Sequence, residues 1–256
     1  MIFRQPLIAS RVAALLLAVC CLSSAAFAQR RTTEVGASPF SSAPYQTGEQ
    51  ITYNVSFANF VTAGHVELFV AGRSTFGGRE GIELRAHVET VGVVSTALYA
   101  INNEYTTFVD PASGVPFRAQ QVIREGGQQN AAGANPANAV NSNFFGGYDF
   151  VSALYRLRAL PLAEGSAYHL LVSDRSNQYD AEVRVVGRES VKTALGSYNA
   201  IVTETRVPNN PPLNNYRLRI YFSDGAQHLP VLITARLPVG EVRAEIASLS
   251  IVEPAS

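Results

Sequence analysis

The chain has 256 residues, of which 20 are lysine or arginine and 20 are aspartate or glutamate, so its formal net charge at pH 7 is zero. No basic run is long enough to follow a phosphate backbone, which argues against a nucleic acid as partner. Both cysteines, Cys20 and Cys21, lie close to the N-terminus.

Residues 1–28 have the pattern of a secretory signal peptide. Arg4 and Arg11 supply the basic region, an apolar stretch follows, and an Ala-Phe-Ala cleavage site ends at Ala28. Cleavage after Ala28 predicts a periplasmic protein with no cysteine, hence with no disulfide and no thiolate nucleophile or metal ligand. The apolar stretch is too short for an anchor, so no transmembrane segment is expected in the mature chain.

Residues 29–47 show no periodic pattern of apolar and polar residues, which is typical of a flexible leader. After them, apolar and polar residues alternate, as in strands with one buried face. The strands predicted in this first half cover residues 50–57, 66–70, 82–88, 104–109 and 117–124. A short helical turn is predicted at 95–101. A Gly-, Asn- and Ala-rich loop is predicted at 125–147, with a short strand inside it near 140–145.

A single helix is predicted from Asp149 towards Gly165. Asp149 can cap the first turn, because its carboxylate accepts hydrogen bonds from free backbone N–H groups. The apolar residues that follow form one stripe, the spacing of an amphipathic helix. Arg156 and Arg158 suit the carbonyl end of the helix, and Pro161 ends it.

Strands are predicted again after the helix. They cover residues 167–173, 179–185, 198–202, 216–222, 229–237 and 242–246. The predicted fold is therefore mainly β, a strongly curved antiparallel sheet or barrel of about eleven strands with one central amphipathic helix. Residues 48–252 are expected to form a single domain.

The strand runs on either side of the helix resemble each other. Residues 67–73 are similar to residues 182–188, and glycines, aspartates and prolines recur at offsets of 114 to 117. The alternatives are an internal repeat of 48–124 in 165–237, or the shared turn and strand preferences of any β protein.

Three motifs resemble an exported bacterial family of unknown function, DUF3108. They are Asp149-x-x-Ser152-Ala153-Leu154-Tyr155-x-Leu157-Arg158, the opening Gly48-Glu49-x-x-x-Tyr53, and Ser223-Asp224 followed by Leu229-Pro230-Val231. The resemblance covers about residues 45–250. It implies an envelope location and a mostly β fold, and it implies no activity. This chain has Phe150 where many members of the family have proline.

The sequence lacks the common catalytic and nucleotide-binding motifs, and no cofactor is predicted. His65 and His87 are expected on one outer face of a hairpin. The alternatives are a weak metal site and, in preference, a solvated mixed-charge face. Asp149 and Ser152 are interpreted as capping residues. Arg158 is expected to pair with a carboxylate on a neighbouring strand.

The inward faces are rich in tyrosine and phenylalanine. They predict either a solid core or a cavity under the helix that holds a hydrophobic ligand. For the second alternative the ligand-binding residues would be Tyr53, Phe57, Leu154, Tyr155 and Arg158. The predicted function is that of an exported envelope protein, without evident catalysis, that binds a hydrophobic or lipid-like molecule. A scaffold that binds another envelope protein is the alternative, and a hydrolase is the least favoured.

Overall fold

The computed structural model describes residues 45–57, 61–127, 138–140, 146–174, 177–238 and 240–252. The predicted signal peptide (1–28), the first part of the predicted leader (29–44) and most of the predicted loop (125–147) lie outside these residues.

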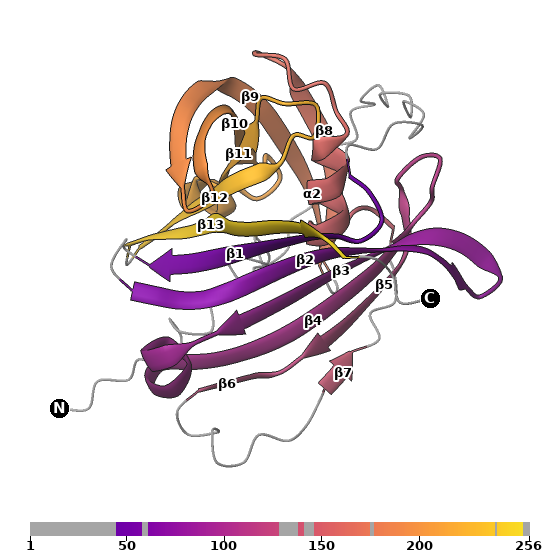
Figure 1. Cartoon of the computed structure of the whole chain (residues 1–256), viewed down its shortest axis with the longest axis horizontal. Coiled ribbons are helices and arrows are strands. Elements are labelled where there is room, and N and C mark those ends of the chain that lie inside the picture. Colours follow the sequence, from indigo (N-terminus) through magenta and orange to yellow (C-terminus); the bar gives the residue numbers. More distant parts are fainter. Residues whose placement is uncertain are drawn as a thin grey trace.

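The described strands form one antiparallel sheet. Their bounds are β1 Glu49–Phe57, β2 Val61–Phe76, β3 Arg79–Thr90, β4 Tyr99–Val109, β5 Pro116–Ile123, β6 Glu125–Gly127, β7 Asn138–Val140, β8 Ala167–Asp174, β9 Asn177–Thr193, β10 Gly196–Arg206, β11 Arg219–Ser223, β12 Pro230–Leu237 and β13 Gly240–Ile251. Across the sheet the order is β7-β5-β4-β3-β2-β1-β13-β12-β11-β10-β9-β8, and β6 pairs with β4 (Figure 1). The sheet is not closed, because β7 and β8 stand at its two ends. The predicted mainly β fold on one large curved antiparallel sheet is confirmed.

The sheet consists of two five-stranded meanders joined by the last strand. In each meander, β1–β5 and β8–β12, strands that follow one another in the chain are neighbours in the sheet. Strand β13 pairs with β1 on one side and with β12 on the other. In Figure 1 the β8–β12 part curls strongly, whereas β1–β5 form a flatter layer.

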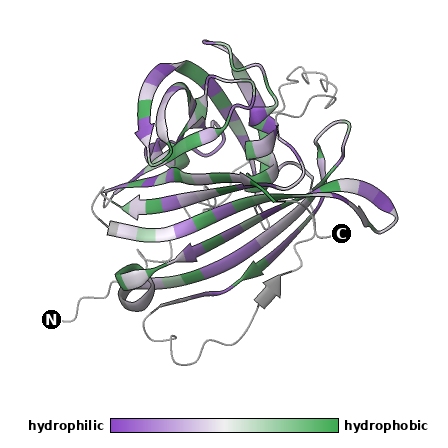
Figure 2. Ribbon diagram, in the orientation of Figure 1, coloured by the Kyte–Doolittle hydropathy of each residue, from purple (hydrophilic) through white to green (hydrophobic). Residues whose placement is uncertain are grey.

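Alternation along the strands builds the core. On β1 the side chains of Ile51, Tyr53 and Val55 are buried, while those between them point outwards. Figure 2 shows the same alternation of hydrophobic and hydrophilic residues on other strands. One main hydrophobic cluster draws on both meanders and on the helix.

The central helix, α2, spans Phe150–Arg158 and lies inside the curl of the sheet. It ends before Pro161, and Ala159 is its C-cap. The sequence predicts one apolar stripe, yet every side chain from Val151 to Arg158 is buried. The reason is that α2 contacts β3 and β4 on one side and β8 on the other. Its polar residues therefore find partners inside the protein.

Two shorter helical turns lie outside the core of the fold. The turn predicted at 95–101 is present as a π-helical turn, η1, at Val94–Leu98. A second, η2, is a 3₁₀ turn at Pro211–Tyr216 that the sequence did not predict. None of the helices in the described ranges has the length and apolar character needed to cross a membrane.

Corresponding backbone contacts recur in the two meanders. Gly48 donates its N–H to the carbonyl of Val70, and Gly165 donates its N–H to the carbonyl of Val185. A β-bulge follows each of these valines, before Gly72 in β2 and before Gly187 in β9. These residues match at the offsets of 115 and 117 found in the sequence. The internal repeat itself stays a prediction.

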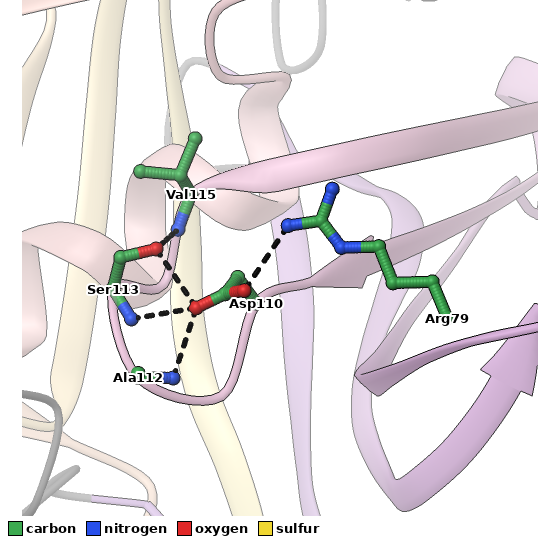
Figure 3. A network of polar contacts seen from close by, with 5 residues as sticks. All are labelled: Arg79, Asp110, Ala112, Ser113 and Val115. Carbon is green, nitrogen blue, oxygen red and sulfur yellow. Dashed lines mark hydrogen bonds and ion pairs between the residues drawn. The ribbon is translucent and has the colours of Figure 1, made fainter.

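The turn between β4 and β5 is fixed by one aspartate (Figure 3). Asp110 accepts hydrogen bonds from the N–H groups of Ala112 and Ser113 at 3.1 and 3.0 Å, and from Arg79 at 3.0 Å. The Ser113 N–H and the Arg79 guanidinium are the main causes that lower the pKa of Asp110. Hydrogen bonds to the ionised form favour that form.

Candidate functional site

The start of α2 is held by an aspartate that has partners on the helix and on the sheet. One carboxyl oxygen of Asp149 accepts a hydrogen bond from the Ser152 N–H at 2.9 Å, and the Asp149 N–H donates to Ser152 Oγ at 3.0 Å. This reciprocal pair is a capping box. The hydroxyl of Thr107 on β4 donates to the second carboxyl oxygen. Burial raises the pKa of Asp149, and these hydrogen bonds oppose the shift.

A cavity of about 120 Å³ lies between α2 and the strongly curled meander. Most of its surface is apolar and comes from the helix and from β8, β9, β11 and β12. The lining residues are Tyr105, Gln121, Asp149, Phe150, Val151, Ala153, Leu154, Leu157, Leu170, Val172, Ser173, Tyr179, Ala181, Val183, Thr205, Val207, Leu218, Ile220 and Ile233.

The half-buried residues of the lining define the rim of the cavity, and two of them, Asp149 and Phe150, stand at the start of α2. The rim consists of Tyr105, Gln121, Asp149, Phe150, Val172, Ser173, Thr205 and Leu218. The lining residues further along the helix and strands, such as Leu157, Val183 and Ile233, are buried. A molecule that enters at the rim would therefore place its apolar part deepest.

One carboxylic acid stands among the residues that line this cavity. It is Asp149, and the lining residues include no lysine, arginine or histidine. The remaining polar groups are amide and hydroxyl groups, from residues such as Gln121, Ser173 and Thr205.

The other end of α2 carries a buried ion pair. Arg158 donates from its two terminal nitrogens to the two carboxyl oxygens of Glu49 at 2.6 and 3.0 Å, and its Nε donates to the Gln227 carbonyl at 3.3 Å. The side chains of Arg158 and Glu49 are 1% and 3% exposed. The expected pairing of Arg158 with a strand carboxylate is thus found, and its partner lies at the start of β1.

Aromatic rings surround this ion pair. The Arg158 guanidinium lies 5.2 Å from the ring centre of Tyr155 and 5.6 Å from that of Tyr45, within cation–π range. Burial raises the pKa of both tyrosines, and likewise that of Tyr53. The hydroxyls of Tyr53 and Tyr155 are buried without a hydrogen-bond partner within the described ranges.

The residues predicted to bind a ligand are divided between these two regions. Leu154 lines the cavity and also a void of about 10 Å³ that Tyr53 shares. Tyr155 and Arg158 belong to the buried cluster at the far end of the helix. Phe57, at the end of β1, is half-buried against the core. Their role in ligand binding stays a prediction.

His65 and His87 lie on the outer face of β2 and β3. In the register of these strands, His65 is opposite Glu89 and His87 is opposite Glu67. Within the described ranges, no group of three histidine, cysteine, aspartate or glutamate residues is placed to hold a metal ion.

Sequence reasoning missed the rim of the cavity. Asp149 was interpreted as a cap, and it caps the helix while it also lines the opening. Tyr105 and Thr107 lie two positions apart on β4, so their side chains share one face of the strand. The position of that strand beside the helix start depends on the folded sheet, so no sequence pattern marked Tyr105 as a rim residue.

Comparison with protein families gives one match. The family DUF3108, described as a protein of unknown function, matches residues 136–247, a range that contains α2 and the curled meander. The resemblance inferred from the motifs is confirmed over this range. No curated protein matches the chain.

Three of the solved structures that match the chain come from bacteria. A candidate exported protein with a YmcC-like fold from Bacteroides fragilis is 14% identical, covers 81% of this chain and 97% of its own, and has a TM-score of 0.34. A beta-barrel-like protein of domain DUF1849 from Brucella abortus is 12% identical, with coverages of 80% and 98% and a TM-score of 0.46. A candidate lipoprotein from Parabacteroides distasonis is 12% identical, with coverages of 80% and 96% and a TM-score of 0.32. None of these names states an activity or a ligand.

Proposed function

We propose that this chain, which matches DUF3108 over residues 136–247, is a periplasmic protein that binds a small apolar molecule, or the apolar end of a larger one, beneath α2. The observation that carries the proposal is the apolar cavity of about 120 Å³ that the helix lines from Asp149 to Leu157. The signal-peptide pattern of residues 1–28 supports the location.

The size of the cavity limits what it can hold. A dry engineered cavity of about 150 Å³ lined by leucine, isoleucine and phenylalanine binds benzene. The cavity of this chain is similar in volume and lining. An aromatic ring or a short alkyl segment would fit inside it, whereas the remainder of a lipid would extend beyond the rim.

The chemistry of the lining supports binding more than catalysis. Asp149 has no histidine or lysine beside it among the lining residues to share acid–base work. Its carboxyl oxygens are engaged by Ser152 and Thr107, which hold the helix in place.

Toluene binding to the purified protein, followed by NMR chemical shifts, tests the proposal. The expected result is saturable binding at one site, with shifts among residues that line the cavity. Ala181 is buried in the cavity wall. The substitution Ala181→Phe should fill the space and weaken toluene binding most. The more conservative Ala181→Leu should weaken it less.

The matched control is Ala112→Phe, because Ala112 is exposed in the β4–β5 turn and lies outside the cavity lining. It should leave toluene binding unchanged. Circular dichroism should show that the variants keep the sheet. Absence of saturable binding to the wild type, or equal binding to a folded Ala181→Leu variant, would contradict the proposal.

A further inference from the structure

The polar end of a ligand in this cavity would meet one ionisable group. The rim contains Asp149, and its other polar side chains are neutral. The lining offers no cation to a carboxylate or phosphate. A buried or half-buried anion without a positive partner is unfavourable, and a second anion beside the first increases the cost.

The start of α2 does not compensate for this lack of cations. A free helix N-terminus favours anions, because its first N–H groups point outwards. Here the Asp149 carboxylate already accepts the Ser152 N–H at 2.9 Å within the capping box. The favourable position for a negative charge is therefore occupied by the chain itself.

Asp149 cannot readily turn away from the rim. One carboxyl oxygen is held by the backbone and side chain of Ser152, and the other by the hydroxyl of Thr107 on β4. These donors, together with the Val151 N–H that also favours the ionised form, keep the carboxylate and its negative charge fixed at the rim.

We infer that the cavity selects apolar ligands whose polar end is a hydrogen-bond donor, an amine cation or a hydroxyl, and that it excludes anionic end groups such as carboxylates. The inference rests on the proposed function and names the class of ligand. The donor lies at the rim against Asp149, and the apolar part extends towards Leu157 and Ile233.

Four probes of nearly equal shape separate the two proposals. Toluene measures the apolar cavity alone. Benzylamine, benzyl alcohol and benzoate add a cationic, a neutral and an anionic end group to the same ring. Titrations at about pH 8 keep benzylamine charged and favour the ionised carboxyl of Asp149. The expected affinities decrease from benzylamine through benzyl alcohol to benzoate, with at least about a tenfold difference between the first and the last.

The test variant is Asp149→Asn, because asparagine caps helices as well as aspartate does and should preserve the fold. In this variant the ratio of benzylamine to benzoate affinity should approach one, and each affinity is compared with that of toluene in the same variant, because Asp149 itself lines the rim. The matched control is Asp110→Asn, the same chemical change at a carboxylate that caps the β4–β5 turn (Figure 3). It should retain the wild-type ratio.

The outcomes distinguish the two proposals. If toluene binds but wild-type protein binds benzoate as tightly as benzylamine, the charge selection is wrong and the cavity proposal stands. The same conclusion follows if the ratio persists in Asp149→Asn. If none of the four probes binds, the cavity proposal fails and the inference fails with it.

Discussion

The ion pair between Arg158 and Glu49 joins two residues that are 109 positions apart in the sequence. It ties the end of α2 to the start of β1. Removing a charge from water is costly, so a buried ion pair is maintained only when both partners are present and well hydrogen-bonded. The two hydrogen bonds between these side chains, together with the contact to the Gln227 carbonyl, satisfy this condition.

We expect Arg158→Met to lower the free energy of unfolding by about 3–5 kcal/mol, because Glu49 would remain as an unpaired buried charge. The double variant Glu49→Leu with Arg158→Met should recover most of that loss. Urea denaturation measures both values.

The control for this prediction is an exposed ion pair. Arg73 and Glu80 are 68% and 57% exposed, so Arg73→Met should change the free energy of unfolding by less than about 1 kcal/mol. A loss in the double variant as large as in Arg158→Met would show that the arginine acts through packing rather than through its charge.

The buried ion pair and the cavity lining could be predicted only in part from individual residues. The sequence indicated that Arg158 needs a carboxylate, because a buried guanidinium is rarely unpaired. It could not single out Glu49 among the acidic residues. Likewise, alternation placed Ala181 and Val183 on an inward face, but the distance between that face and the helix, which creates the cavity, is set by packing of the whole sheet.

At the scale of elements, the two meanders begin with equivalent glycines. Gly48 and Gly165 have φ angles of +83° and +81°, and each donates to a valine before a bulge. Their surroundings differ. A Cβ atom on Gly48 would lie 2.0 Å from the Val252 carbonyl oxygen, whereas one on Gly165 would meet nothing within 4 Å.

This difference predicts unequal effects of the same substitution. Gly165→Ala should lower the free energy of unfolding by about 1–2 kcal/mol, because alanine is strained in the left-handed backbone conformation. Gly48→Ala should lower the free energy of unfolding by at least about twice as much, because the added methyl group would also push the Val252 carbonyl at the end of β13 out of place. Thermal and urea unfolding of both variants would check the order, and equal losses would contradict it.

The elements themselves were largely predictable. Period-2 alternation identified the long strands of both meanders, and the Asp149 cap identified α2. The helix was expected to be amphipathic because a surface helix has one apolar stripe. Its burial on all sides arises from enclosure by distant strands, which leaves no local sequence signature.

At the scale of the whole molecule, β13 is the strand that connects the two meanders. Within the described residues no strand of β1–β5 pairs directly with a strand of β8–β12. The inward residues Val242, Ala244 and Ile246 add to the common core. Without β13, both β1 and β12 would have an open edge.

We expect a chain that ends after Leu237 to lack a cooperative unfolding transition, since the core would lose its central strand and expose two edges. A chain that ends after Val252 keeps all of β13 and serves as control; it should unfold like the full chain. Circular dichroism during urea denaturation, with limited proteolysis, measures the difference. A stable truncated chain would show that the meanders fold independently.

The place of β13 also has a consequence for biogenesis. Of the described strands, the one at the middle of the sheet comes last along the chain and therefore leaves the ribosome after the others. A growing chain can form hairpins earlier, yet it cannot complete its hydrophobic interior before β13 has been synthesised. Until then the two meanders lack the strand that joins them, so the complete fold must wait for its central strand.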